Sequence, residues 1–167
     1  PFTLQRIYCN QSKHWLVKPR KPMNEDSVII HGITHSDLSD APDLKRILEE
    51  VLDSLAGKIV VVHYRNIERR FFDRALKERL GEGILFPMVD TLEIESIIQN
   101  QAISGWWNKL RRKKAESVRL GTSRTRYNLP AYQPHHALVD AIATAELLQA
   151  QIHYHFSPET PISEIWC

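Results

Sequence analysis

The chain has 167 residues, 43% of them hydrophobic, with a formal net charge of +2 and two cysteines. This length and composition fit one compact domain with a buried core. They argue against a membrane span, since no apolar run approaches the roughly 20 residues of a transmembrane helix, and against a disulfide framework, because Cys9 and Cys167 stand near opposite ends. We expect a soluble, cytoplasmic protein with reduced cysteines.

The first predicted elements are two short strands, at 4–10 and 13–19, followed by an amphipathic helix. The stretches LQRIYCN and KHWLVKP alternate apolar with polar residues, as strands do. Apolar residues then recur at helical spacing over 44–55. Asp40 is the expected N-cap of this helix and Gly57 its end.

The next predicted elements alternate strands with helices. KIVVVHY is a continuous β-branched run, typical of a strand covered on both faces. A helix ending near Gly81, a brief strand at 88–89 and a helix over 92–101 follow. An irregular basic stretch leads to a final helix over 137–152. This order predicts an α/β fold with layered helices and strands.

The irregular stretch between Lys109 and Arg126 is strongly basic. It holds eight basic residues against one acid, Glu116, although the whole chain carries only +2. Clustered cations bind phosphates, so Arg111 and Arg112 are candidate contacts for a nucleic-acid backbone. Three aromatic residues beside the stretch could stack on unpaired bases: Trp106, Trp107 and Tyr127. The alternative is a solvated surface with the tryptophans in the core.

Two segments carry candidate catalytic residues. The KIVVVHY strand leads to His63 and Glu68, and functional groups collect where strands of open α/β sheets end. An acid in the first turn of a helix is also favoured by the helix dipole alone. Asp140 lies among apolar positions of the final helix, where a carboxylate is costly unless it is paired or binds a metal. His135 and His136 precede it, and the residues alone leave structural and functional roles open for both.

Four segments in order resemble the DEDDh 3′–5′ exonucleases, the family of the proofreading epsilon subunit of bacterial DNA polymerase III, ribonuclease T and oligoribonuclease. They are SVIIHGITHSDL, VVVHYRNIERRFF, PMVDTLEIE and RYNLPAYQPHHALVDAIATAELL. The resemblance covers roughly residues 13–152. It implies a ribonuclease H-like fold, a mixed sheet flanked by helices, in a single exonuclease domain over 1–167 with 153–167 as a C-terminal tail.

The resemblance also assigns roles. His135 matches the general base and Asp140 a metal-binding carboxylate, because the family's catalytic histidine precedes its last aspartate by five residues. His63 matches the histidine of the middle motif, and Glu68 stands where the family has aspartate. Asp73 is the less favoured substitute for Glu68. The residues expected to contact the substrate are Ile30, His31, Ile67 and His63, together with Arg111 and Arg112 of the basic stretch.

The activity that the resemblance implies is two-metal-ion hydrolysis at the 3′ end of single-stranded nucleic acid, DNA in preference to RNA, releasing nucleoside 5′-monophosphates. Oxygen ligands favour Mg²⁺ or Mn²⁺. The family's first motif, an Asp and a Glu one residue apart, would precede residue 1. We therefore expect an N-terminally incomplete chain without the first strand and with little activity.

Two other functions are alternatives to the exonuclease. One is a nucleic-acid-binding module that derives from such an enzyme and no longer cleaves. The other is a structural domain in which His63, His135 and Asp140 only satisfy hydrogen bonds of the core.

Overall fold

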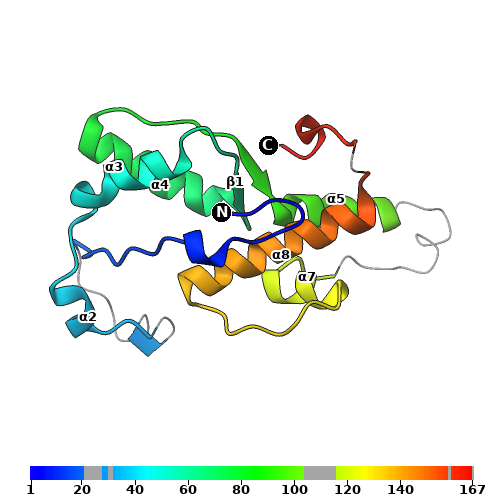
Figure 1. Cartoon of the computed structure of the whole chain (residues 1–167), viewed down its shortest axis with the longest axis horizontal. Coiled ribbons are helices and arrows are strands. Elements are labelled where there is room, and N and C mark those ends of the chain that lie inside the picture. The colour runs from blue at the N-terminus through cyan, green and yellow to red at the C-terminus, as the bar shows by residue number, and fades with distance from the viewer. Residues whose placement is uncertain (21–27, 30–31, 104–115, 158, 167) are drawn as a thin grey trace.

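The computed structural model describes residues 1–20, 28–29, 32–103, 116–157 and 159–166 as an arrangement of helices around a small sheet (Figure 1). The principal helices are α2 (His35–Ser39), α3 (Leu44–Leu55), α4 (Arg65–Leu80), α5 (Thr91–Ile103), α7 (Leu120–Arg126) and α8 (Ala137–His155). The strands are β1 (Val60–Val62) and β2 (Met88–Asp90), and 3₁₀ turns lie at Cys9–Gln11 and Ile162–Glu164. The predicted α/β class is confirmed. Within the described ranges, no helix is both long and apolar enough to cross a membrane.

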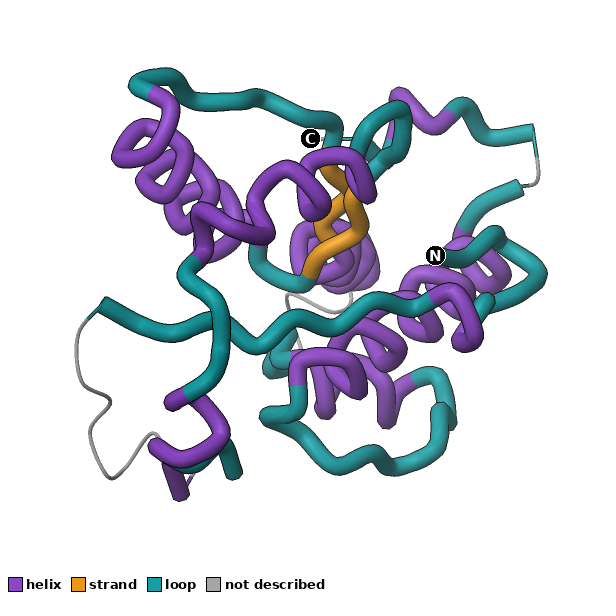
Figure 2. The backbone as a smooth tube through the Cα atoms, turned by 60° about the vertical axis from the view of Figure 1, so that its left-hand side comes forward, coloured by secondary structure: helices purple, strands orange, loops and turns teal. Residues whose placement is uncertain are grey.

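The sheet consists of β1 and β2, paired in parallel with Val61 opposite Val89. Parallel strands need a crossover connection, and α4 lies within it. In Figure 2 the two strands lie side by side among the helices, with α8 packed against β1 and α4 against β2. Both strands therefore end at the same edge of the sheet, where α4 and α5 begin. This edge is the place where the fold brings polar side chains together.

The core lies between β2, α5 and α8. Val89, Ile94 and Leu148 form a buried cluster, on which Phe2 from the start of the chain also packs. On the other side of the sheet, Leu76 of α4 is fully buried. The sequence predicted both strands from their apolar runs and the main helices from their spacing, and these predictions are confirmed.

The N-cap predicted for α3 was wrong. Asp43 occupies that position and its side chain accepts a hydrogen bond from the backbone N–H of Lys45 at 2.9 Å, whereas Asp40 ends α2. Pro42 disfavours helical backbone at the residue before it, so α3 starts only after this proline. The predicted end of α4 is confirmed, because Gly81 has the left-handed φ of 79° that glycine tolerates at a helix end.

The two strands predicted near the start of the chain were also wrong. The described structure has there an isolated antiparallel bridge between Phe2 and Ile7 and then the 3₁₀ turn at Cys9–Gln11. Alternating apolar residues produce a strand only where another strand is available to pair with them. Among the described residues, β1 and β2 form the only ladder.

Candidate active site

The carboxylate of Asp90 joins the carboxyl ends of β1 and β2. It is 3% exposed and accepts hydrogen bonds from the backbone N–H groups of Tyr64 and Arg65 at 2.9 Å each, and of Leu92 at 3.0 Å. Tyr64 directly precedes α4, has a left-handed φ of 84° and provides no side-chain cap. Asp90 therefore acts as the cap for the start of α4 as well as α5. Its position fixes the direction in which α4 leaves the sheet.

Glu68 lies in the first turn of α4, as predicted, and its side chain is half-buried. Among the described residues, its Oε2 is buried without a hydrogen-bond partner. Burial raises the pKa of Glu68, and the negative charge of Asp90 adds to this rise. A desolvated carboxylate oxygen without a donor gains most from a cation. The donor chemistry of Glu68 therefore fits a hard divalent ion such as Mg²⁺ or Mn²⁺.

His63 follows β1 at the same edge of the sheet. Its Nδ1 lies 2.8 Å from the hydroxyl oxygen of Thr91, and that hydroxyl donates its hydrogen to the carbonyl oxygen of Val62 at 3.1 Å. Burial lowers the pKa of His63 more than the opposing charge of Asp90 raises it. The ring is therefore mainly neutral at pH 7 and fixed to the first residue of α5.

Asp140 lies in the first turn of α8 and contacts the loop that carries His135. Its Oδ2 accepts a hydrogen bond from the backbone N–H of His135 at 3.1 Å. His135 has a φ of 72°, a left-handed conformation uncommon for residues other than glycine. One carboxylate thus holds the backbone of the predicted general base in this conformation, a link that the sequence did not reveal. The ring of the neighbouring His136 lies against that of His14, 5.3 Å between centroids.

The convergence of Glu68, Asp140 and His135 on one metal site stays a prediction. In the part of the chain that the structure describes, no three His, Cys, Asp or Glu side chains form a group that could hold a metal ion. Ile67 is 60% exposed on α4, and Asp73 is engaged in an ion pair along that helix. The other candidates lie outside the described residues: Ile30, His31, Arg111, Arg112, Trp106 and Trp107.

The end of the basic stretch differs from the prediction. Its last residues form helix α7 in place of an irregular segment. Arg124 is buried, and Arg126 donates to the carboxylate of Glu95 at 2.8 Å. Tyr127, which we predicted to stack on bases, is buried. Arg126 and Tyr127 point toward Glu95 and Arg124 points toward α8, so these three side chains are not placed to form the proposed nucleic-acid surface.

Glu95 is a buried site residue that the sequence analysis missed. It is 2% exposed and accepts hydrogen bonds from Arg126, from the hydroxyl of Tyr127 at 3.0 Å and from the side-chain amide of Gln151 at 2.9 Å. Burial raises the pKa of the Tyr127 hydroxyl well above its ordinary value, and the negative charge of Glu95 raises it further. The signal was present in the sequence, since Glu95 stands three residues after Leu92, at the spacing of the buried helix face.

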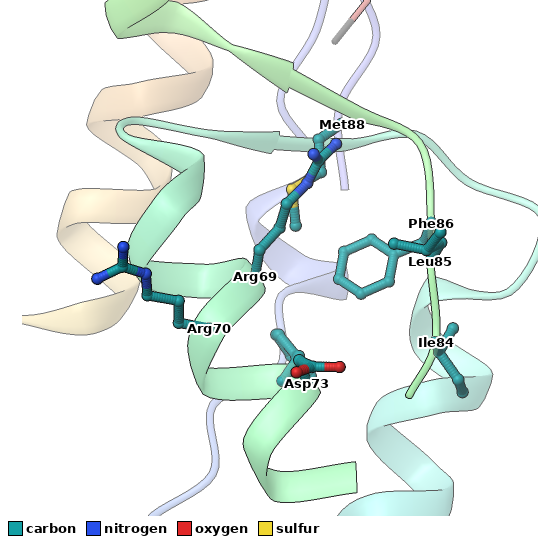
Figure 3. A pocket seen from close by; sticks show the side chains of 8 residues that line it. Arg69, Arg70, Asp73, Ile84, Leu85, Phe86 and Met88 are labelled. Atoms are coloured by element: carbon teal, nitrogen blue, oxygen red, sulfur yellow. The ribbon is translucent and has the colours of Figure 1, made fainter. Parts of the chain in front are cut away.

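Cavities are present beside the strands. One of about 230 Å³ lies between α4 and the segment that leads into β2, as Figure 3 shows. Its lining is Arg69, Arg70, Phe72, Asp73, Ile84, Leu85, Phe86 and Met88. A second, of about 340 Å³, is lined by Asp90, by residues of α5 and by the C-terminal segment up to Trp166. Neither cavity is lined by Glu68, His135 or Asp140.

Comparison with known proteins adds an independent observation. The model of the RNase T exonuclease family matches residues 5–148. The DNA polymerase III subunit epsilon of Haemophilus influenzae is 28% identical over 147 residues, which cover 86% of this chain and 53% of that protein. The PolC-type DNA polymerase III of Thermotoga maritima is 30% identical over 136 residues, covering 80% of this chain and 9% of that protein. The chain thus spans about half the length of the epsilon subunit and a small part of PolC.

Proposed function

The chain belongs to the RNase T exonuclease family, and from this premise we propose that it carries the site of a two-metal-ion 3′–5′ exonuclease. The substrate is the 3′ end of single-stranded nucleic acid, DNA in preference to RNA, and the products are nucleoside 5′-monophosphates. The observation that carries the proposal is the buried Oε2 of Glu68 at the edge where the strands end, which has no hydrogen-bond partner within the described part of the chain. A carboxylate oxygen in that condition is suited to a cation.

In this proposal Glu68 and Asp140 are two of the ligands that hold Mg²⁺ or Mn²⁺. When bound, two such ions stabilise the charge that develops on the phosphoryl oxygens and on the leaving 3′ oxygen. The remaining carboxylates would come from an Asp-x-Glu pair in a segment that precedes residue 1. Because hard-cation affinity depends on the number of charged ligands, we expect the 167-residue chain alone to bind Mn²⁺ weakly.

His135 is the proposed general base. Its imidazole takes the proton of the attacking water while the water oxygen bonds to phosphorus and the bond from phosphorus to the 3′ oxygen breaks. An imidazole suits this role because it changes charge near neutral pH. The hydrogen bond from its backbone N–H to Asp140 ties the base to a proposed metal ligand, since both residues move with the start of α8.

The proposed substrate contacts surround these residues. Ile67 directly precedes Glu68 and its apolar side chain is exposed, so it can pack against the terminal nucleotide. The ring of His63 can contact the same nucleotide. Because this ring is neutral, it does not repel a metal cation bound nearby. Ile30 and His31 are assigned to the pocket of the same terminal nucleotide, and Arg111 and Arg112 to the phosphates further along the nucleic-acid strand.

The test uses the full-length protein, with any segment that precedes residue 1, a 5′-labelled single-stranded oligonucleotide and Mn²⁺. We expect a ladder that shortens from the 3′ end, and His135→Ala should slow cleavage by about 10²–10⁴-fold, the usual contribution of a general base. His136→Ala is the matched control. The ring of His136 packs on that of His14, so we expect this variant to leave the rate unchanged. Cleavage at the wild-type rate by His135→Ala would show that the base is elsewhere.

Asp140→Asn separates a metal ligand from a structural cap. The amide oxygen of asparagine can still accept the hydrogen bond from the His135 backbone, so the loop should remain in place while the negative charge is lost. We expect the melting temperature to change little and Mn²⁺-dependent cleavage to fall sharply. Binding of the oligonucleotide without cleavage by the wild type would favour a non-catalytic binding module instead.

A further inference from the structure

We propose that Arg124 is a positioning residue that fixes the loop carrying His135 against α8. The proposal rests on the proposed function only in taking His135 as the general base. Arg124 lies in α7 and is 3% exposed, so its guanidinium is fully inside the protein. The segment that it holds, residues 128–136, is called the His135 loop below.

The guanidinium of Arg124 joins three parts of the chain. Nη1 donates to the carbonyl oxygen of Ala143 in α8 at 2.7 Å and forms an ion pair with Glu146 at 2.7 Å. Nη2 donates to the carbonyl oxygen of Pro130 in the loop at 3.0 Å. The guanidinium also lies over the ring of Tyr132, 5.0 Å from its centroid. One side chain therefore binds the loop at two points and α8 at two more.

The anchors of the loop on α8 are close together. Asp140 accepts the hydrogen bond from the His135 backbone, and Ala143, which accepts the one from Arg124, is three residues further along α8, about one helical turn. Pro130 and His135 are thus both attached to the first turns of one helix, the first through Arg124 and the second directly. The loop is fastened on either side of Tyr132.

The other face of α7 is fixed as well. Arg126 donates to Glu95 of α5 and to the carbonyl oxygen of Ser117, while Arg124 faces α8. Because these contacts attach α7 to α5, the helix that carries Arg124 is held in a fixed position. The two arginines of SRTRY therefore hold the loop between two helices, and neither is available to bind phosphates.

A lysine cannot replace Arg124 in this arrangement. The planar guanidinium donates from separate nitrogens to two carbonyl oxygens while it stacks on a ring, whereas an ammonium is a single compact charge. Arg124→Lys keeps the charge for Glu146 and loses the simultaneous contacts with Pro130 and Tyr132. A general base acts only within hydrogen-bond reach of its proton, so a displaced loop lowers the rate of the chemical step.

The first arm of the test measures hydrogen exchange by mass spectrometry in the 167-residue chain, without metal or substrate. Arg124→Lys should speed exchange across the His135 loop about tenfold or more, the effect of losing roughly 1.4 kcal/mol of local stability. Protection in the second half of α8 should remain. Arg119→Lys, at the exposed start of the same helix, is the matched control and should leave the loop unchanged.

The second arm measures cleavage by the full-length protein with Mn²⁺. We expect Arg124→Lys to lower kcat on the order of 10–100-fold, because small displacements of catalytic groups have effects of this size, with KM changed less than about twofold. Glu146→Gln removes the ion pair and leaves both carbonyl contacts of Arg124. The amide oxygen of glutamine can still accept a hydrogen bond from Nη1, so kcat should stay within about threefold of the wild type.

Tyr132→Leu keeps the test decisive if Arg124→Lys does not fold. It removes the ring beneath the guanidinium and leaves the buried charge paired, so the fold should persist while exchange in the loop increases. Unchanged exchange in the loop for both variants overturns the positioning role. A wild type that does not cleave nucleic acid would instead refute the proposed function, and the exchange arm would still decide whether Arg124 holds the loop.

Discussion

Replacing Asp90 by alanine tests whether one carboxylate holds the starts of two helices. The wild-type side chain accepts three backbone hydrogen bonds, from Tyr64, Arg65 and Leu92. A buried donor left unpaired costs about 1–3 kcal/mol, and loss of an N-cap about 0.5–2 kcal/mol. Tyr64 is exposed, so water can reach part of this site in the variant. We therefore expect Asp90→Ala to lower the free energy of unfolding by about 3–5 kcal/mol.

Asp90→Asn is the matched variant. Oδ1 accepts from Tyr64 and Leu92 and Oδ2 from Arg65, so an amide oxygen in the place of Oδ1 keeps two of the three bonds. We expect a loss of about 1–2 kcal/mol. Removing the negative charge should also lower the raised pKa of Glu68, to which Asp90 contributes.

The assay for both variants is urea denaturation of the 167-residue chain at pH 7, followed by far-UV circular dichroism. An unchanged m-value would show that the difference lies in stability and not in the compactness of either state. Two results would refute the reasoning. Asp90→Ala within 1 kcal/mol of the wild type would mean that the caps contribute little, and equal losses in both variants would mean that the charge, not the hydrogen bonds, matters.

Three further predictions concern buried and basic side chains. Because burial raises the pKa of Glu68, the folded state holds that proton to higher pH than the unfolded state. The free energy of unfolding should therefore fall as pH rises from the ordinary value of 4.5 through the raised one, and Glu68→Gln should flatten this fall in urea titrations. Tyr127→Phe removes one donor from Glu95 and should cost about 1–2 kcal/mol, measured by urea denaturation; no loss would show that the bond is not formed. Changing four cations of the basic stretch to alanine should weaken binding of single-stranded oligonucleotide and make the slope of log K against log salt shallower by roughly 2–3, while an unchanged slope would mark a merely solvated surface. The four are Arg111, Arg112, Lys113 and Lys114.

The sequence was sufficient for elements whose signal is local. The β-branched run gave β1, and apolar residues at helical spacing gave α3, α4, α5 and α8, because each pattern describes how one segment is buried. The strands predicted at 4–10 and 13–19 failed because a strand also depends on a partner elsewhere in the chain. Helix α7 was missed because its residues are basic and polar, without apolar residues at helical spacing. The contact of Arg126 with the buried Glu95 becomes visible only in the structure.

The candidate site was predictable in the same uneven way. Glu68 and Asp140 were predicted as metal ligands from their places at a strand end and on an apolar helix face, and that role stays a prediction. The role of Asp90 was not found, although it stands in the PMVDTLEIE segment, because its bonds to Tyr64 and Arg65 span 26 and 25 residues. Such contacts depend on the strand register, which the sequence alone does not specify. Arg124 was counted among exposed cations because charge does not reveal which guanidinium is buried.

The carboxylates near the strand ends differ in how their oxygens are satisfied. Both oxygens of Asp90 and of Glu95 accept hydrogen bonds from within the fold, so stability alone accounts for these residues. Asp140 uses Oδ2 to hold the loop. Glu68, among the described residues, keeps a buried oxygen with no donor. Burial of an unsatisfied carboxylate oxygen destabilises the folded state, and such groups collect at functional sites because a ligand compensates for them. Among these four, Glu68 is thus the carboxylate whose buried oxygen the described fold leaves unsatisfied, and this supports its proposed role as a metal ligand.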